Sequence, residues 1–259
     1  MLFRYRVIPV LLLRDKGLYK SVKFKNHKYV GDPINVIRIF NEKEVDEIIL
    51  LDINATINNH EPDYKIIEDI ASECFMPLCY GGGINNLKQI ERILKLGVEK
   101  IVINSRLFDN LDFVRSAVDN FGSSTIVASI DYKYNFLGGN YVYTHSGTYS
   151  SNIDVDECTR IVEEMGVGEI ILNSIDKDGT LSGYDHKLIN KITHSLSIPL
   201  IACGGASSLS DFHDVIHIAG ASAVAAGSFF VFVGPHRAVL VNYPTQLELE
   251  ESVFKNNNP

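Results

Sequence analysis

The sequence contains no apolar stretch that approaches the roughly 20 residues needed to cross a bilayer, so a membrane protein is not expected. Cysteine is scarce and has no CxxC spacing: Cys74, Cys79, Cys158 and Cys203 are expected to be buried reduced thiols, as in the cytoplasm. The net charge of −8 argues against nucleic-acid binding. A phosphorylated small-molecule substrate remains compatible because backbone N–H groups bind phosphate. We expect no cofactor and no metal.

The length of 259 residues suits one closed α/β barrel, which typically needs roughly 250 residues. The N-terminal run MLFRYRVIPVLLLRDKG could be mistaken for a signal peptide, but Arg4 and Arg6 interrupt it and no small-residue cleavage site follows. We interpret it as a first strand. No low-complexity linker divides the chain, so residues 1–252 are expected to form a single domain and residues 253–259 a frayed tail.

Short β-rich runs alternate with amphipathic stretches, as expected of βα units around a parallel sheet. The predicted strands are Tyr5–Leu13, Glu47–Asp52, Pro77–Tyr80, Lys100–Asn104, Thr125–Asp131, Glu169–Asn173, Pro199–Cys203 and Ala223–Ala226. The clearest helical patterns are Asn86–Leu96, Asp154–Met165 and Ser208–Ala219. This pattern alone allows either a barrel or a doubly wound open sheet.

An internal repeat favours the barrel. The segment DEIILLDINAT matches GEIILNSIDKDGT, and Glu169 lies 122 residues after Glu47. The segment PLCYGGGINNLKQIERILKLG matches PLIACGGASSLSDFHDVIHIAG, where Gly204 again lies 122 residues after Gly82. Two segments with one offset imply two half-barrels of four βα units each, and therefore a (β/α)₈ TIM barrel.

Glycine-rich turns follow corresponding strands in the two halves. Gly81–Gly83 follows the third strand and Asn104-Ser105 ends the fourth; Gly204-Gly205 and Gly227-Ser228 take the same places in the second half. Glycine lets the backbone approach a ligand closely, and the helices that follow could direct their N-terminal N–H groups at it. In a barrel these loops share the C-terminal face. Twin sites predict a substrate with a phosphate at each end; tight turns without a ligand, or a nucleotide diphosphate sugar, are the alternatives.

Several motifs in this chain are those of one known family. They are GDP at Gly31–Pro33, LDI at Leu51–Ile53, GGGI at Gly81–Ile84, INS at Ile103–Ser105, AxID ending at Asp131, YTHSG at Tyr143–Gly147, DxDGTxxGYD at Asp176–Asp185 and ACGGASSL from Ala202. With them the chain resembles the cyclase subunit of imidazole glycerol phosphate synthase, a lyase of histidine biosynthesis, from the first strand to about Phe232.

The resemblance implies a half-barrel repeat that binds a bis-phosphorylated ribonucleotide, PRFAR, and uses ammonia from a glutaminase subunit to make imidazole glycerol phosphate and AICAR. It also implies a heterodimer with that glutaminase at the bottom of the barrel. Carried over by motif, Lys20 would hold a phosphate from a mobile first loop. The other phosphate or substrate positions would be Gly82, Gly83, Asn104, Ser105, Asp178, Gly179, Gly204, Gly205, Gly227 and Ser228.

The acid–base pair of that family is incomplete in this sequence. The family uses two aspartates, at the ends of the first and fifth strands, and Asp131 matches the second. The first stands in an IPxLD segment that in this chain reads IPVLL, with Leu12 at the aspartate position. Leucine cannot transfer a proton, and Asp15 lies three residues further along. Losing one acid–base group typically costs at least ~10²–10⁴ in rate, and the related isomerase of the pathway also needs an acid at this position.

A second set of family residues is kept. The ring of charges that gates ammonia entry at the bottom of the barrel in that family corresponds to Arg6, Glu47, Lys100 and Glu169. Charged residues also begin strands simply to stay solvated. However, barrel interiors are usually apolar, and two acids with two bases can close a salt-bridged ring.

The end of the chain departs from the family. Pro235 is predicted to start a last helix and Pro244 to end it. His236 and Arg237 would lie near the upper face beside the eighth-strand phosphate turn, where they could recognise a different substrate or simply be solvated. A hairpin-like insertion after the fifth strand ends at Tyr143–His145, and we interpret His145 as structural.

Three functions remain open. The first is a synthase-like subunit of a glutamine amidotransferase that passes ammonia to another acceptor, because paralogues with this substitution are expected to serve amidation of surface-polysaccharide sugars with a separate sugar-modifying enzyme. The second is a working histidine-biosynthesis cyclase in which Asp131 suffices. The third is a non-catalytic scaffold that activates the glutaminase.

Overall fold

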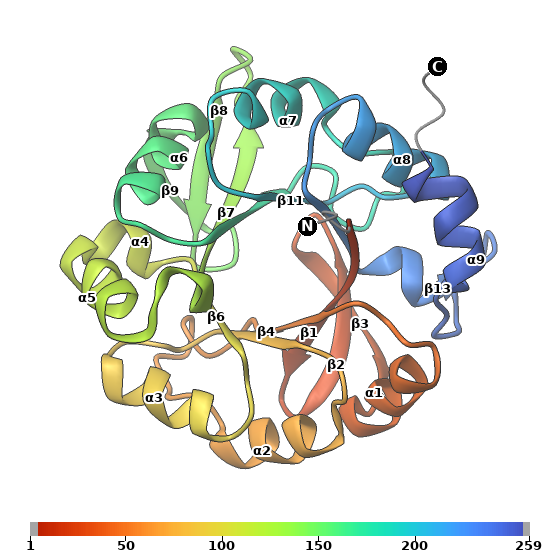
Figure 1. Ribbon diagram of the computed structural model, residues 1–259, viewed down its shortest axis with the longest axis horizontal. Helices are drawn as coiled ribbons and strands as arrows, with labels where there is room; N and C mark the ends of the chain where they lie inside the picture. The colour runs from red at the N-terminus through yellow and green to blue at the C-terminus, as the bar shows by residue number, and fades with distance from the viewer. Residues whose placement is uncertain (1–4, 256–259) are drawn as a thin grey trace.

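A computed structural model of the chain describes residues 5–255. Its parallel strands follow the order β10-β11-β12-β1-β4-β5-β6-β7, and β10 also pairs with β7, which closes the barrel. These strands are β1 (Arg6–Arg14), β4 (Ile48–Asp52), β5 (Leu78–Gly81), β6 (Lys100–Ile103), β7 (Ile126–Tyr134), β10 (Glu169–Ser174), β11 (Leu200–Cys203) and β12 (Ala223–Ala226). Figure 1 looks down this barrel. The predicted (β/α)₈ fold is confirmed.

Helices form a ring outside the strands (Figure 1). They are α1 (Pro33–Glu42), α2 (Tyr64–Glu73), α3 (Leu87–Lys95), α4 (Arg106–Asp109), α5 (Leu111–Phe121), α6 (Val155–Glu164), α7 (His186–Thr193) and α8 (Leu209–His217), with short turns η1 (Ser123–Thr125) and η2 (Ser228–Phe230). The three helices predicted from sequence are present. Their predicted first residues are the N-caps: the side chains of Asn86, Asp154 and Ser208 each accept an N–H bond from the first turn.

The alternation of side chains along each strand separates two apolar layers. On β1, Val7, Leu11 and Leu13 pack outward beneath the helices, in the large core between barrel and helices. Ile8 and Val10 point inward, and Leu12 packs partly buried against the same inner cluster. The inner cluster also holds residues 49, 102, 127, 171 and 201, so most of the barrel interior is filled by branched apolar side chains.

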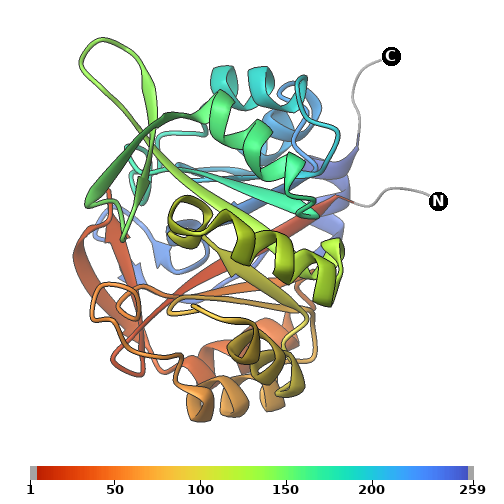
Figure 2. The same cartoon turned by 90° about the vertical axis from the view of Figure 1, so that its left-hand side faces the viewer.

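Two β insertions rise from the C-terminal ends of the barrel strands. One is the hairpin β2 (Gly17–Val22) and β3 (Lys25–Gly31); the other consists of β8 (Asn140–Thr144) and β9 (Tyr149–Asp154), which extend β7. Figure 2 shows the red and green insertions projecting on the same side of the molecule. The insertion after the fifth strand was predicted. The first loop was not predicted to be a hairpin, and Lys20 lies on strand β2 rather than in an irregular loop.

The last segment differs from the predicted helix. Strands β13 (Phe232–Val233) and β14 (Ala238–Val239) form a small hairpin, and Pro235 is the second residue of its turn, in which Arg237 N–H donates to the Gly234 carbonyl at 3.1 Å. Proline suits this turn position as well as it suits a helix start, because both need φ near −65°.

The final helical turns come after Pro244, as α9 (Gln246–Leu249) and η3 (Glu250–Phe254). Val253 is fully buried, and its carbonyl lies 2.9 Å from His217 Nε2, so the predicted tail boundary at 253 is too early. Residues 256–259 of that predicted tail lie outside the described residues. Within residues 5–255, no helix is both long and apolar enough to span a membrane.

Candidate active site

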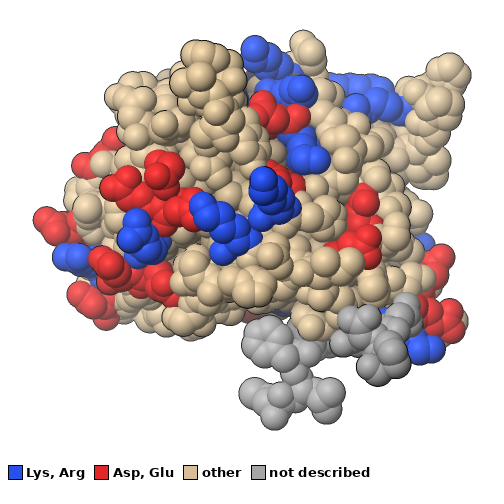
Figure 3. Space-filling view, turned by 90° about the horizontal axis from the view of Figure 1, so that it is seen from above, with Lys and Arg blue, Asp and Glu red and all other residues tan. Residues whose placement is uncertain are grey.

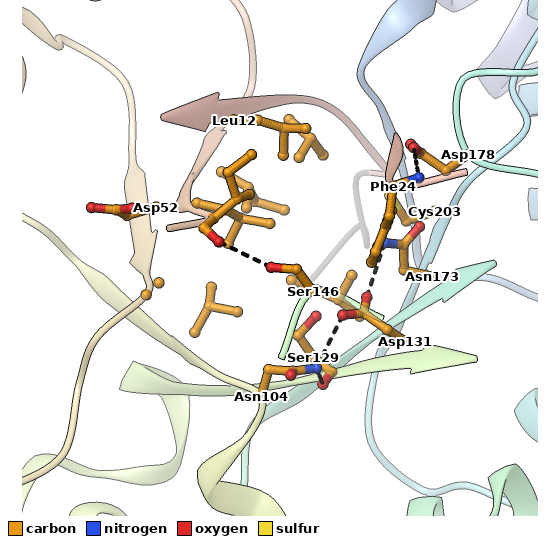
Figure 4. Close-up of a pocket in the computed structure, with 18 of the residues that line it drawn as sticks. Leu12, Phe24, Asp52, Asn104, Ser129, Asp131, Ser146, Asn173, Asp178 and Cys203 are labelled. Atoms are coloured by element: carbon orange, nitrogen blue, oxygen red, sulfur yellow. Dashed lines mark hydrogen bonds between the residues drawn. The ribbon is translucent and has the colours of Figure 1, made fainter. Parts of the chain in front are cut away.

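A pocket opens at the C-terminal ends of the barrel strands, and it gathers the residues predicted for the site. It is lined by Lys20, Gly82, Gly83, Asn104, Ser105, Asp131, Asp178, Gly179, Gly204, Gly205, Gly227 and Ser228. Leu12, Leu51 and Cys203 supply an apolar part of its wall. Figure 4 shows this arrangement, with Leu12 and Asp131 brought from different strands to the same cavity.

Asp131 is the buried acid of the pocket. It points inward from β7 because Val127 and Ser129 precede it at two-residue spacing. Asn104 Nδ2 and Asn173 Nδ2 donate to its two carboxylate oxygens, at 3.2 and 3.0 Å (Figure 4). Burial raises the pKa of Asp131 to about 7, although the hydrogen bond from Asn173 opposes the shift. A carboxyl group that titrates near neutral pH is suited to either donating or accepting a proton.

The position of the missing acid is occupied by a leucine that faces the same cavity. Leu12 is half-buried in the pocket wall, in register with Leu51 on β4. Asp15 does not replace it: Asp15 lies in the β1–β2 turn, with 67% of its side chain exposed, and pairs with Arg14 at 3.3 Å. The pocket therefore has Asp131 without the second acid of the family pattern.

Because the Asp131 carboxyl is buried, we predict that the folding stability of the chain depends on pH. In the folded chain its pKa is about 7 because of burial, whereas an unfolded aspartate titrates at about 3.9. The folded state therefore binds this proton more tightly, and the group's contribution to stability falls as the pH rises from about 4 through 7.

Asp131→Asn should remove this loss of stability at higher pH. We expect thermal unfolding of the variant at a higher temperature than wild type at pH 8, with a smaller difference at pH 5. Asn173 can turn its amide to accept from the new side chain, because its Oδ1 is buried without a partner. Asp15→Asn, at an exposed site, is the control and should show no such trend. A difference that does not depend on pH contradicts the prediction.

The glycines of the pocket loops are required by packing as well as by any ligand. Gly179 has φ of +66°, and a Cβ there would collide with the Ser21 carbonyl of the β2–β3 hairpin. Gly82, with φ of +119°, lies similarly close to the Asp52 carbonyl at the end of β4. These turns therefore hold the rim of the pocket together independently of phosphate.

The helices that follow the glycines begin directly after their predicted first residues, which are their N-caps. α3 and α8 start at Leu87 and Leu209, and the side chains of Asn86 and Ser208 cap their first turns. Each of these caps accepts from one N–H of its first turn, so the part of the two helices in phosphate binding stays a prediction. Residues of the turns at the neighbouring strand ends, such as Ser105 and Ser228, line the pocket.

Lys20 is buried in the second half of the pocket. Its Nζ donates to the Val10 carbonyl, and it lies so near the Gly227 turn that a Cβ on Gly227 would be 2.7 Å from it. Burial lowers its pKa to about 8, while the charge of Asp178 partly offsets the effect. The Asp178 carboxylate accepts from Ser21 Oγ at 2.7 Å and from Phe24 N–H at 3.3 Å, so this acid anchors the hairpin to the pocket (Figure 4).

Among the pocket residues that were not predicted from sequence, Asn173 and Ser129 lie closest to the chemistry of Asp131. Asn173 binds Asp131 and keeps its own Oδ1 unpaired within the pocket wall, and Ser129 lies one inward position below Asp131. The signal for Asn173 was its Asn-Ser pair at a strand end, which repeats the pair at Asn104. His145 also lines the pocket. Its ring Nδ1 lies 2.9 Å from Thr144 Oγ1, and its backbone N–H donates to Ser105 Oγ at 3.3 Å. Both contacts are compatible with a structural role.

The predicted charged residues form a closed ring at the opposite end of the barrel. Arg6 pairs with Glu47 and, at 2.7 Å, with Glu169; Lys100 pairs with both acids at 3.1 Å. Cys79 Sγ also donates to Glu47, at 2.8 Å. Each base therefore contacts both acids. Charged residues that began their strands only to remain solvated would not form such shared contacts.

The ring holds its charges although it is largely shielded from water. Burial alone would raise the pKa of Glu47, but attraction to Arg6 and Lys100 outweighs it and the pKa is lowered. Burial likewise opposes the charge of Arg6 and Lys100, yet the two glutamates raise the pKa of both bases. Among residues 5–255, no group of three or more His, Cys, Asp or Glu is arranged to hold a metal ion.

Fold and site together define a (β/α)₈ barrel with a glycine-rimmed pocket at its C-terminal face and a ring of four charges at the other end. The family model described as Histidine biosynthesis protein matches residues 6–234. A Pseudomonas aeruginosa protein, provisionally named imidazole glycerol phosphate synthase subunit hisF2, is 53% identical over 247 residues, or 95% of this chain and 98% of the relative.

Other relatives agree with this match. A Vibrio vulnificus protein provisionally named imidazole glycerol phosphate synthase subunit hisF3 is 46% identical over 253 residues, 97% of each chain. Imidazole glycerol phosphate synthase subunit HisF of Saccharolobus solfataricus is 39% identical over 226 residues, 87% of this chain and 89% of the relative. The chain therefore belongs to the histidine biosynthesis protein family and is a HisF-like member of it.

Proposed function

We propose that this chain is the synthase-side subunit of a glutamine amidotransferase that conducts ammonia to an acceptor other than the histidine-pathway intermediate. The observation that carries this proposal is Leu12, which faces the pocket where the family pattern has an acid, in a barrel whose bottom ring is complete. A ring-closing lyase of the family pattern uses two acid–base groups, of which this pocket has one, whereas passage of ammonia needs neither.

The ring supports ammonia entry from a glutaminase. Arg6, Glu47, Lys100 and Glu169 close the bottom of the barrel, and the interior above them is apolar, with the small residues Ala223 and Ala225 on one strand. An apolar interior suits neutral ammonia better than ammonium, because burying an unpaired charge is costly. The proposed assembly is a heterodimer with the glutaminase at the bottom face, in the cytoplasm, where the four cysteines stay free.

The proposed acceptor is a sugar of a surface polysaccharide, amidated by a separate enzyme that receives ammonia from the upper face. The pocket also retains the two sets of glycine turns, so we propose that it holds a phosphorylated small molecule. The phosphate positions are the predicted ones, and Asp131 is the residue proposed to act as acid or base on that molecule.

A second candidate is a histidine-pathway cyclase that works with one acid. Asp131 favours it, because a group with a pKa of about 7 can both donate and accept a proton near neutral pH. In that case Asp131→Asn should abolish turnover. A scaffold that only activates the glutaminase would instead stimulate glutamine hydrolysis equally with and without Asp131.

The deciding experiment mixes the purified chain with the bis-phosphate intermediate and saturating ammonium and follows the intermediate's absorbance. We expect binding without appreciable turnover. Turnover at the rate of a HisF enzyme, abolished by Asp131→Asn, would overturn the proposal and make this chain a histidine-pathway cyclase. Adding the glutaminase and glutamine in place of ammonium then tests whether the chain stimulates glutamine hydrolysis.

A further inference from the structure

The hairpin β13–β14 brings a cation to the rim of the pocket. Arg237 follows the Gly234-Pro235 turn, and its guanidinium reaches from the hairpin to the pocket rim. Nη1 donates to the Gly179 carbonyl at 2.9 Å, and Nη2 donates to Ser228 Oγ at 3.3 Å. Both partners line the pocket, and both belong to the phosphate site predicted for the second half of the barrel.

The guanidinium is held in place by its own hairpin and by the neighbouring one. It lies over the ring of Phe232, 4.6 Å from the centroid. Lys28, on β3, donates to the Arg237 carbonyl at 3.0 Å and approaches the same ring at 5.2 Å. Arg237 is therefore half-buried and oriented before any ligand arrives, which lowers the entropy lost on binding.

The two ends of the pocket differ in positive charge. At the second-half end, Lys20 lies against Gly227 and Arg237 contacts Ser228, so two cations flank one short turn. At the first-half end, the guanidinium of Arg106 is bound to Asn85 Oδ1 at 2.7 and 2.9 Å. Asp178, whose charge acts on Lys20, has its carboxylate bound to Ser21 Oγ and to Phe24 N–H.

The surface around this end is also basic. In the view of Figure 3, several Lys and Arg side chains lie along the upper edge of the molecule, although the chain carries a net charge of −8. The β2–β3 hairpin that contacts Arg237 and Asp178 contributes exposed lysines at positions 23, 25 and 28. Local positive charge of this kind attracts an anionic ligand to a protein that would otherwise repel it.

We propose that Arg237 is a direct ligand of the phosphate at the second-half end of the pocket, where with Lys20 it selects a phosphate monoester dianion. The inference rests on the proposed function, in which the pocket holds a phosphorylated molecule, and it names the residues that recognise one phosphate of that molecule. An arginine has five N–H donors in a planar fork that matches phosphate oxygens, and two of them are engaged by Gly179 and Ser228. The others can bind the phosphate while Ser228 donates its hydroxyl to it.

The test titrates inorganic phosphate into the wild-type chain and variants by isothermal calorimetry. Arg237→Gln should weaken one of the binding events by roughly 10- to 100-fold, the range expected for charge-assisted hydrogen bonds. Arg237→Lys keeps the charge but not the fork and should fall in between. Arg115→Gln removes the same charge from the exposed face of α5 and should leave both events unchanged.

The outcomes separate this inference from the proposed function. If the wild type binds phosphate and Arg237→Gln binds it equally well, Arg237 is not a ligand and the phosphorylated-ligand proposal stands. If the wild type binds no phosphate, both fail. Circular dichroism of each variant checks folding, and Arg237→Lys provides the comparison should the glutamine variant unfold: affinity equal to wild type would then count against a bidentate contact.

Discussion

Replacing Leu12 with aspartate should raise ammonia-dependent turnover of the bis-phosphate intermediate by about 10²-fold or more, the range contributed by one acid–base group. The position already points into the pocket that holds Asp131, so the new carboxyl needs no change of backbone. Its neighbour in register is Leu51, and this apolar contact should keep the new carboxyl poorly solvated and its pKa high, as suits a proton donor. The measurement is loss of the intermediate's absorbance under saturating ammonium.

Two variants control for this gain. Leu12→Asn has nearly the same shape as the aspartate variant but cannot exchange a proton, so it should stay at the wild-type rate. Asp131→Asn, added to Leu12→Asp, should remove the gain because the two acids act together. Equal activity in Leu12→Asp and Leu12→Asn would mean that position 12 contributes polarity rather than proton transfer. The absence of a proton-transfer group at this position would then not be the reason for low cyclase turnover.

Removing Glu47 should destabilise the chain by about 3 kcal/mol, the lower end of the range for breaking a buried ion pair. Only 2% of its side chain is exposed, and its loss leaves Arg6 and Lys100 to share Glu169. Their side chains are 23% and 19% exposed, which is why the lower end applies. For a chain of this size, Glu47→Ala should lower the melting temperature by about 6–12 °C.

The matched control is Glu91→Ala, which breaks an exposed ion pair with Lys95 on α3 and should cost less than about 1 kcal/mol.

The stabilisation that Glu47 provides should also depend on pH. Its pKa is lowered in the folded chain, because the two bases outweigh the opposing effect of burial. Its stabilisation is present above the unfolded pKa of about 4.3 and is lost as the pH falls through the lower folded value. Wild type and variant should therefore converge in acid; equal melting temperatures for the two variants at pH 7 would show that the ring contributes nothing.

The barrel and its twin glycine turns were accessible from sequence because they depend on short-range periodicity and on repetition, such as the offset between Glu47 and Glu169. The acid–base position at Leu12 and the ring of four charges were predicted from the family resemblance instead. In the structure, alternation along β1 puts Arg6 and Leu12 on its inner face, and the four ring residues meet at one end of the barrel. These features need no knowledge of side-chain packing.

The features that were missed depend on contacts between distant segments. Pro235 fits a helix start and a turn equally well, and only the pairing of Phe232 with Val239 decides between them. Lys20 was assigned to a loop by the family resemblance. In the structure, the pairing of β2 with β1 and the contact of the β2–β3 hairpin with Asp178 define this segment as a hairpin. The bond from Asn173 to Asp131 depends on the register of β7 with β10, which places the two residues directly opposite each other.

Strand β1 carries both ends of the machinery on one inner face. Arg6 belongs to the bottom ring and Leu12 to the upper pocket, with Ile8 and Val10 between them. At about 3.3 Å per residue the two ends lie roughly 20 Å apart, too far for a change at one to alter contacts at the other. Under the proposed function, a single substitution in the upper pocket changes what is made from ammonia while the bottom ring keeps its glutaminase, so such a barrel acquires a new product without a new nitrogen source.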